Sequence, residues 1–173
     1  MFRLSIIAIC LFGLSLVTQA KASGFFVGPS LFYQSVAVDN NGTTTDGAET
    51  SYDLHVGYDF GGLYAGILYS AETYTAENNN RTSTGVSIGY MNNGWHIIGS
   101  YILSSEEQVA AGSTRKEGSG IHLAFGHLFQ VTSSFSIGPQ LKYYSYEYNK
   151  LNDTEIPYKE TRIIPFVGLG FKF

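Results

Sequence analysis

The chain has 173 residues, of which 10 are Lys or Arg and 14 are Asp or Glu, so its formal net charge is −4 at pH 7. This acidic balance gives no electrostatic footprint for nucleic acid, and no nucleic-acid partner is expected. The length suits one ordinary domain, and the high content of aromatic residues (15%) and glycine (20 residues) favours strands over helices.

Residues 1–22 have the composition of a secretory signal peptide. Arg3 supplies a positive charge near the start, an apolar run follows over 4–17, and a small-x-small cleavage pattern ends at Ala22. The apolar run is shorter than the ~20 residues that a membrane-spanning helix needs. We therefore expect an exported chain whose mature domain covers 23–173.

Alternation of apolar and polar residues predicts eight β-strands in the mature domain. The clearest alternation is in 52–60, where every second residue is aromatic or aliphatic. The expected strands cover 25–38, 52–60, 63–73, 84–91, 95–103, 120–129, 135–148 and 161–173.

The connections between these strands alternate between short and long. One of the short ones, Asn93-Gly94, predicts a type I′ hairpin turn, because both central residues of that turn need φ > 0. The longer connections are polar and are expected to be loops: 39–51, 74–83, 104–119 and 149–160. Short turns at one end and long loops at the other are typical of an antiparallel up-and-down transmembrane β-barrel.

If the apolar face of each strand points outward, the opposite face is polar and rich in glycine. An eight-stranded barrel has a lumen only wide enough for its own side chains, so a through-channel is not expected. Unpaired charge in such an interior is costly, and we predict an ion-pair network in which Asp53, Asp59 and Glu72 face Lys142 and Arg162 on the last two strands. The predicted lumen network consists of Asp53, His55, Glu72, Lys142 and Arg162.

Aromatic side chains near the strand ends are expected to form the girdles that barrels place at the two membrane interfaces. These residues are Tyr33, Tyr52, Tyr90, Trp95 and Tyr101.

Three prolines, Pro29, Pro139 and Pro165, fall inside predicted strands. A closed barrel has no free edge to tolerate a missing N–H, so each proline is expected at a bulge or near a rim.

With a signal peptide, alternating ribbons, alternating connection lengths and a terminal Phe171-Lys172-Phe173, the mature chain resembles the small eight-stranded outer-membrane barrels of the OmpX/Ail and OmpA-transmembrane-domain type. The resemblance covers the architecture of nearly the whole mature chain, and no motif selects one named family. It implies a location in the bacterial outer membrane. It also implies that the assembly machinery of that membrane recognises the last strand through Phe173, with Phe171 on the same face.

The leading hypothesis is a monomeric outer-membrane protein with a structural or surface-interaction role. Its expected partners are outer-membrane lipid and lipopolysaccharide, together with an extracellular ligand bound through loops 39–51 and 104–119. No cofactor is expected. The only cysteine, Cys10, lies in the signal segment, which leaves no cysteine-based metal site in the mature domain.

Two alternatives stay open at this point. Some small outer-membrane barrels modify lipid A with a His/Ser pair, and hydrolysis of this kind needs a nucleophile, a base and an orienting group. The histidines His55, His96 and His122 are predicted inward, and Ser87, Ser100 and Ser104 could lie within reach of one of them. The second alternative is a periplasmic lipocalin-like barrel, which would reverse the two faces and hold an apolar ligand inside.

Overall fold

The computed structural model describes residues 23–40, 43–75, 78–109 and 112–173. The predicted signal peptide, 1–22, lies outside the described residues. In the described part of the chain, no helix has the length and apolar character to cross a bilayer. The strands assigned there are β1 (Gly24–Asn40), β2 (Thr43–Asp59), β3 (Leu63–Tyr74), β4 (Asn79–Asn92), β5 (Trp95–Val109), β6 (Ser113–His127), β7 (Phe129–Gln130), β8 (Phe135–Leu151) and β9 (Thr154–Lys172).

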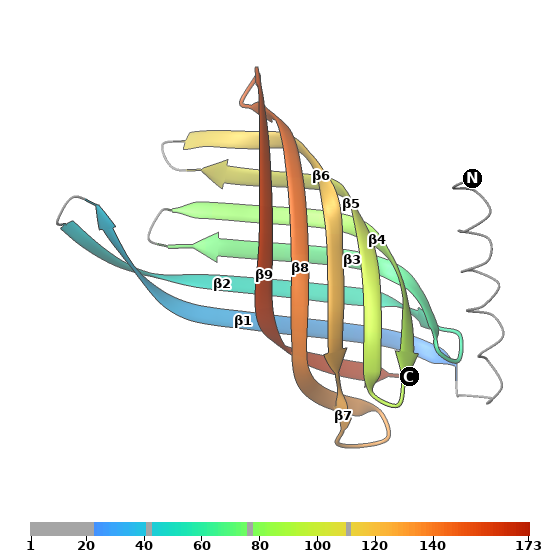
Figure 1. Ribbon diagram of the computed structural model, residues 1–173. Helices are drawn as coiled ribbons and strands as arrows, with labels where there is room; N and C mark the ends of the chain where they lie inside the picture. Colours follow the sequence, from blue (N-terminus) through green and yellow to red (C-terminus); the bar gives the residue numbers. More distant parts are fainter. Residues whose placement is uncertain (1–22, 41–42, 76–77, 110–111) are drawn as a thin grey trace, which may run out of the picture.

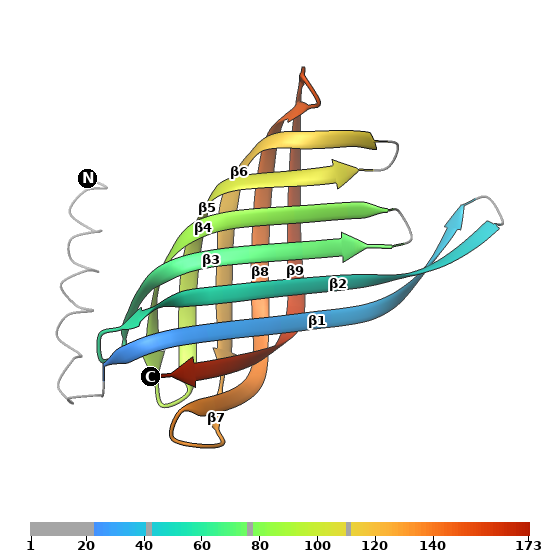
Figure 2. The same cartoon turned by 180° about the vertical axis from the view of Figure 1, so that it is seen from behind.

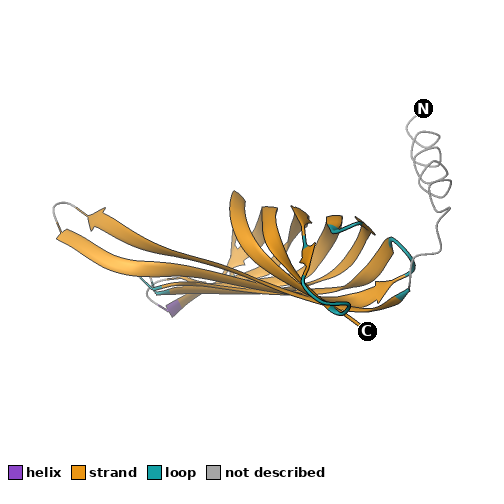
Figure 3. Ribbon diagram, turned by 90° about the horizontal axis from the view of Figure 1, so that it is seen from below, coloured by secondary structure: helices purple, strands orange, loops and turns teal. Residues whose placement is uncertain are grey.

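The strands form one antiparallel sheet that curves strongly and returns to its start (Figures 1 and 3). Consecutive strands pair from β1 to β6, β6 pairs with β8, β8 with β9, and β9 with β1. The short strand β7 continues β6 past Leu128 along the same edge of β8, so the ring contains eight strands. The predicted all-β, up-and-down, eight-stranded architecture is confirmed.

The strands extend well beyond their predicted ends. β1 and β2 pair as far as Asn40 and Thr43. β8 and β9 pair as far as Leu151 and Thr154. The loops predicted for 39–51, 74–83, 104–119 and 149–160 were therefore wrong, because most of these residues belong to paired hairpins. Their polar residues hide the alternation that marks a strand, but the neighbouring strand still supplies the hydrogen bonds.

Tight turns connect the hairpins at both ends of the barrel. Asn93 and Gly94 have φ of 48° and 83°, which confirms the prediction that both adopt positive φ. Asn78 and Asn152 also have positive φ, which lets the extended hairpins reverse direction within few residues. We call the end that holds Asn93-Gly94, the start of β1 and the last strand's carboxyl end the short-turn end, and the opposite end the hairpin end.

Hydrophobic side chains cover the outer wall. Ile67, Ile88 and Ile163 are 59%, 74% and 66% exposed, whereas Asp53 and Lys142 inside the ring are fully buried. Apolar residues on the outside and charges on the inside are what a bilayer requires of a barrel. The structure contradicts the lipocalin-like alternative, which needs the opposite arrangement.

Aromatic rings fill the lumen where glycines leave room for them. A Cβ at Gly66 would lie 2.3 Å from the Tyr64 hydroxyl, and one at Gly57 would lie 2.8 Å from the Tyr64 ring. The Tyr64 ring packs edge-on against Phe26, with centroids 5.7 Å apart. Glycine at these two positions is therefore needed for the close approach of a large buried ring.

The three prolines predicted inside strands, Pro29, Pro139 and Pro165, each lie where one ladder is interrupted. The β1–β9 ladder joins Val27 to Phe171 and Ser30 to Gly168, and it has no pair at Pro29. Pro139 lies opposite the break between β6 and β7. Pro165 lies on β9 beyond the last pair with β1. The missing N–H of each proline thus falls beside a gap in the hydrogen bonding.

Candidate functional site

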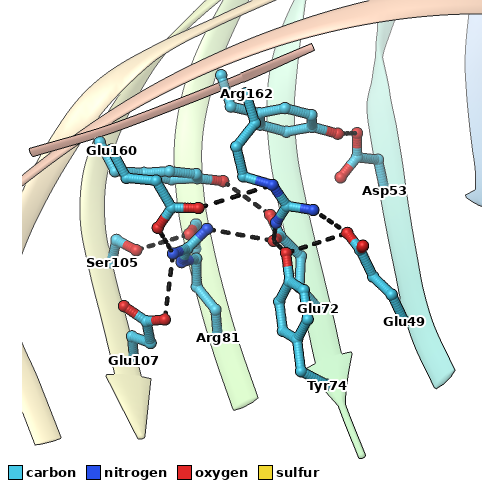
Figure 4. A network of polar contacts seen from close by, with 12 residues as sticks. Glu49, Asp53, Glu72, Tyr74, Arg81, Ser105, Glu107, Glu160 and Arg162 are labelled. Atoms are coloured by element: carbon cyan, nitrogen blue, oxygen red, sulfur yellow. Dashed lines mark hydrogen bonds and ion pairs between the residues drawn. The ribbon is translucent and has the colours of Figure 1, made fainter. Parts of the chain in front are cut away.

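Seven charged side chains meet inside the hairpin end of the barrel, and we call them the mouth cluster. They are Glu49, Glu72, Arg81, Glu107, Arg115, Glu160 and Arg162. They come from β2, β3, β4, β5, β6 and β9, so the cluster connects most of the ring (Figure 4). At this level the outward residues are polar, as at Thr73, Thr82 and Thr161, which places the cluster beyond the apolar part of the outer wall.

Two arginines hold the mouth cluster together. The Arg162 guanidinium donates to Glu72 at 2.5 Å and also to Glu49. The Arg81 guanidinium lies 3.2 Å from Glu72 and 3.2 Å from Glu107, and it also contacts Glu160. Because each guanidinium has five N–H donors in a planar fork, it can bridge several carboxylates at once.

Tyrosines surround these charges. The Arg81 guanidinium lies 4.4 Å from the centre of the Tyr146 ring, and that of Arg115 lies 3.6 Å from the Tyr158 ring. The Tyr74 hydroxyl donates to Glu49 at 3.0 Å. A cation over an aromatic face is attracted by the ring quadrupole, so the rings stabilise the arginines while filling the lumen.

A second group of charges lies deeper, at mid-barrel, and we call it the central cluster. Lys142 donates to Asp53 at 2.6 Å and also to Ser30, and the Tyr144 hydroxyl donates to Asp53 at 2.7 Å. His122 Nε2 lies 3.6 Å from the same carboxylate. Charges this deeply buried remain ionised only when paired and hydrogen-bonded, and these contacts meet that requirement.

The predicted lumen residues all point inward, but they divide between the two clusters. Glu72 and Arg162 meet in the mouth cluster, whereas Asp53 and Lys142 meet in the central cluster. His55 lies beside His122, with ring centroids 5.5 Å apart.

The predicted role of Asp59 was wrong. Asp59 lies 2.6 Å from Lys172, near the short-turn end. Asp59 lies six positions after Asp53 on the same strand, which is roughly 20 Å along the barrel, so it cannot reach Lys142 or Arg162.

Sequence reasoning did not find five members of the mouth cluster: Glu49, Arg81, Glu107, Arg115 and Glu160. All five lie in segments that were interpreted as loops, where residues on alternate sides of a strand are not expected. One usable signal was present on β8, where Tyr144, Tyr146 and Tyr148 recur at every second position and are all buried. That spacing predicts a strand whose inner face is aromatic up to the rim.

The predicted girdle residues lie on or near the outer wall. Tyr33, Trp95 and Tyr101 are each more than half exposed, Tyr52 is less exposed, and Tyr90 is half-buried. Trp95 stacks on Phe125 with ring centroids 5.5 Å apart.

The carboxyl-terminal aromatics occupy different environments. Phe171 is half-buried and packs on Phe135, with ring centroids 5.1 Å apart. Phe173 is exposed, and its backbone N–H and C=O pair with Phe25, both at 3.0 Å. The final residue therefore helps to close the ring at the short-turn end.

A serine, a histidine and a carboxylate do line up in the central cluster. Ser100 Oγ lies 3.5 Å from His122 Nδ1, and His122 Nε2 faces Asp53. Ser100 is also bonded to Ser87 at 2.8 Å. All of these side chains are at most 4% exposed, so a substrate carbonyl has no access to the hydroxyl. The geometry supports packing and charge pairing in the lumen.

Ser104 points outward, so the expectation that it could lie within reach of an inward histidine was wrong. The pairing register shifts between Thr84 and Gly85, where Ser104 and Ile102 are the successive partners on β5. This bulge turns Ser104 outward and places Ser105 in the lumen, where it bonds to Tyr148 at 2.8 Å. Among the residues that the structure describes, no group of three or more His, Cys, Asp or Glu side chains is arranged to hold a metal ion.

Five members of the mouth cluster line a cavity of about 500 Å³ at the hairpin end: Glu49, Glu107, Arg115, Glu160 and Arg162. Arg115, Tyr158 and Tyr74 contribute to its wall. On the outer side of the same end, Lys159 lies 2.6 Å from Glu147, and this hydrogen bond raises the pKa of Lys159. Both side chains are exposed, so their pairing is screened by solvent.

Comparisons with known proteins bear on the fold. No family model matches the chain, and no curated protein matches its sequence. Among solved structures, the crystal structure of Neisserial surface protein A is similar, with a TM-score of 0.56 and 16% sequence identity. The match covers 88% of this chain and 100% of that chain. This likeness concerns the fold, and it agrees with the ring of eight strands.

Proposed function

We propose that this chain is a bacterial outer-membrane β-barrel whose lumen is closed by charged side chains and whose role is structural or in surface interaction. The observation that carries the proposal is the contrast between the two faces of one ring. Ile67, Ile88 and Ile163 are among the many hydrophobic residues exposed outside, and Asp53 and Lys142 are fully buried inside. In water the outer wall would be a large apolar patch, whereas in a bilayer it is solvated by hydrocarbon.

In this proposal the short-turn end faces the periplasm and the hairpin end faces the cell exterior. The signal peptide exports the chain, and the assembly machinery recognises Phe173 and Phe171 on the last strand. Lipid and lipopolysaccharide surround the wall, and an extracellular ligand contacts the hairpins that contain 39–51 and 104–119. The exposed, paired charges near the rim, such as Lys159 and Glu147, suit the polar headgroup region.

Fractionation tests the location. When the chain is produced in a Gram-negative host, we expect it in the outer-membrane fraction, folded and migrating differently on a gel before and after boiling. Recovery as a soluble periplasmic protein would contradict the proposal.

A conductance measurement tests the closed lumen. The mouth cluster and the central cluster both cross the interior, so we expect no porin-like current from the purified protein in planar bilayers. The matched variant combines Glu72→Ala with Arg162→Ala, which removes one ion pair from the mouth cluster. If these charges obstruct the lumen, the variant should conduct a larger ionic current than the unmodified protein. A large open-channel current from the unmodified protein would contradict the closed lumen.

A comparison of lipid A from cells with and without the gene addresses the enzyme alternative. The buried Ser100 and His122 favour no change in the lipid A mass spectrum. Loss or gain of an acyl chain would reverse this conclusion.

A further inference from the structure

The seam between β1 and β9 is closed over only part of its length. Backbone pairs join Phe26 to Lys172, Val27 to Phe171, Ser30 to Gly168 and Leu31 to Val167. By contrast, β1 pairs with β2 along its whole length.

The hairpin half of both seam strands has a free edge. In the described part of the chain, no backbone pair joins β1 from Phe32 onward to β9 before Val167. The two strands run apart there, with β1 following β2 and β9 following β8 (Figures 1 and 2). Where the backbone pairing stops, the rings of Phe32 on β1 and Phe166 on β9 still lie side by side, with centroids 6.0 Å apart.

In this region the charged side chains of β9 contact strands other than β1. Arg162 of β9 reaches Glu49 on β2 and Glu72 on β3, and Glu160 of β9 reaches Arg81 on β4. Side chains therefore cross the seam here, whereas the described residues of the two backbone edges form no pair with each other.

Unpaired edges of this kind are unfavourable in a membrane protein. They begin within the apolar part of the wall, where Tyr33 and Ile163 face outward and are 63% and 66% exposed. Backbone N–H and C=O groups without a partner are strongly unfavourable in hydrocarbon, where no water replaces the missing hydrogen bond. A free strand edge is also a template for pairing with another strand.

We propose that the two free edges pair with those of a second copy of this chain, in the orientation that the proposed membrane location gives it. β1 runs from the short-turn end to the hairpin end, and β9 runs back. A twofold axis along the barrel direction places β1 of one copy antiparallel to β9 of its partner, and the reverse pair forms at the same time. Such an interface is self-complementary and closed, so it satisfies both edges of both copies. A single extended peptide could satisfy only one edge. The proposed dimer thus takes the place of the monomer that was expected from the sequence.

Disulfide trapping in intact cells tests the dimer. In a Cys10→Ser background the chain has no other cysteine. Continuing the register of Leu31 with Val167 places Ser35 opposite Ile163, and both side chains are exposed. Two differently tagged chains, one with Ser35→Cys and the other with Ile163→Cys, are produced together and oxidised. We expect a disulfide-linked dimer that carries both tags, in excess over either same-variant dimer.

Two controls make the result decisive. A chain that carries both Leu31→Cys and Val167→Cys should form a disulfide within one copy, because these two residues already pair across the seam. In a single chain that carries both Ser35→Cys and Ile163→Cys, an internal disulfide would show that β1 and β9 of one copy pair with each other at this position. Light scattering of the unmodified protein in detergent should give twice the mass of one chain. Absence of the mixed dimer, or an internal bond only in the Ser35→Cys/Ile163→Cys chain, would overturn the inference. Neither result bears on membrane location, which fractionation tests separately.

Discussion

Arg162 and Glu72, from β9 and β3, meet across the lumen with 2.5 Å between Nη1 and Oε2. Ninety residues separate them in the sequence. Glu72 is almost fully buried, and Arg81 approaches the same oxygen from β4. One carboxylate thus connects the last strand of the barrel to its middle strands. Removing it should weaken the ion pairs throughout the mouth cluster.

Glu72→Gln and Arg162→Met are each expected to lower the free energy of unfolding by about 3 kcal/mol, because each removes one partner from the buried charges of the mouth cluster. Urea unfolding in detergent micelles, followed by fluorescence of Trp95, the only tryptophan, measures the change. Lys159→Met is the matched control, since its pair with Glu147 is exposed and should leave the stability unchanged. If both lumen variants are as stable as the control, the mouth cluster does not stabilise the barrel.

The central cluster makes a separate prediction. Lys142→Met should cost about 3–5 kcal/mol, because Asp53 is then left ionised in a fully buried site. Combining it with Asp53→Leu should recover most of that loss, since removing both charges of a buried pair is often close to neutral. A double-mutant cycle from the same unfolding experiment gives the coupling. Additive losses would show that the two residues do not act as a pair.

A charge on the outer wall tests the lipid environment. Ile88→Arg is expected to cost about 2–4 kcal/mol in liposomes, because Ile88 lies in the apolar part of the wall and is 74% exposed. Thr82→Arg lies on the outward face of the same strand but nearer the hairpin end, and should cost about 0–1 kcal/mol. Equal effects of the two substitutions on folding would contradict a hydrocarbon environment around Ile88.

Glycine in the lumen gives a steric prediction. Gly66→Ala would place a methyl group 2.4 Å from the Val56 carbonyl oxygen as well as against Tyr64, and we expect a loss of about 1–3 kcal/mol from this overpacking. Gly99→Ala is the matched control, because its nearest neighbour lies at an ordinary 3.5 Å. Thermal unfolding of the two variants should separate them. If Gly66→Ala unfolds at the same temperature as Gly99→Ala, the Tyr64 ring is not packed tightly against Gly66.

Local patterns in the sequence predicted much of this fold. The alternation in 52–60 assigned the two faces of β2, and Asn93-Gly94 predicted a tight turn with positive φ at both residues. These features depend only on the two-residue period of a strand and on steric limits within single residues. The inward position of Asp53 and Lys142 followed from the same alternation.

The predictions failed where a strand depends on its neighbour. The polar ends of β2 and β4, which carry Glu49 and Arg81, have no apolar alternation, and only pairing with adjacent strands makes them strands. The outward turn of Ser104 depends on a bulge between β4 and β5. Bulges and ladder lengths are set by how whole strands fit together, and a single segment does not contain that information.

By itself, the sequence determined that the chain forms β-strands with one apolar and one polar face, and that tight turns join some of them. Only the tertiary structure decided which charges meet: Glu72 with Arg162, Asp53 with Lys142, and Asp59 with Lys172. It also decided how far β1 and β9 pair. The reason is physical, because the face of a residue follows from its own strand, whereas its partner across a barrel follows from the register, twist and curvature of all the strands together.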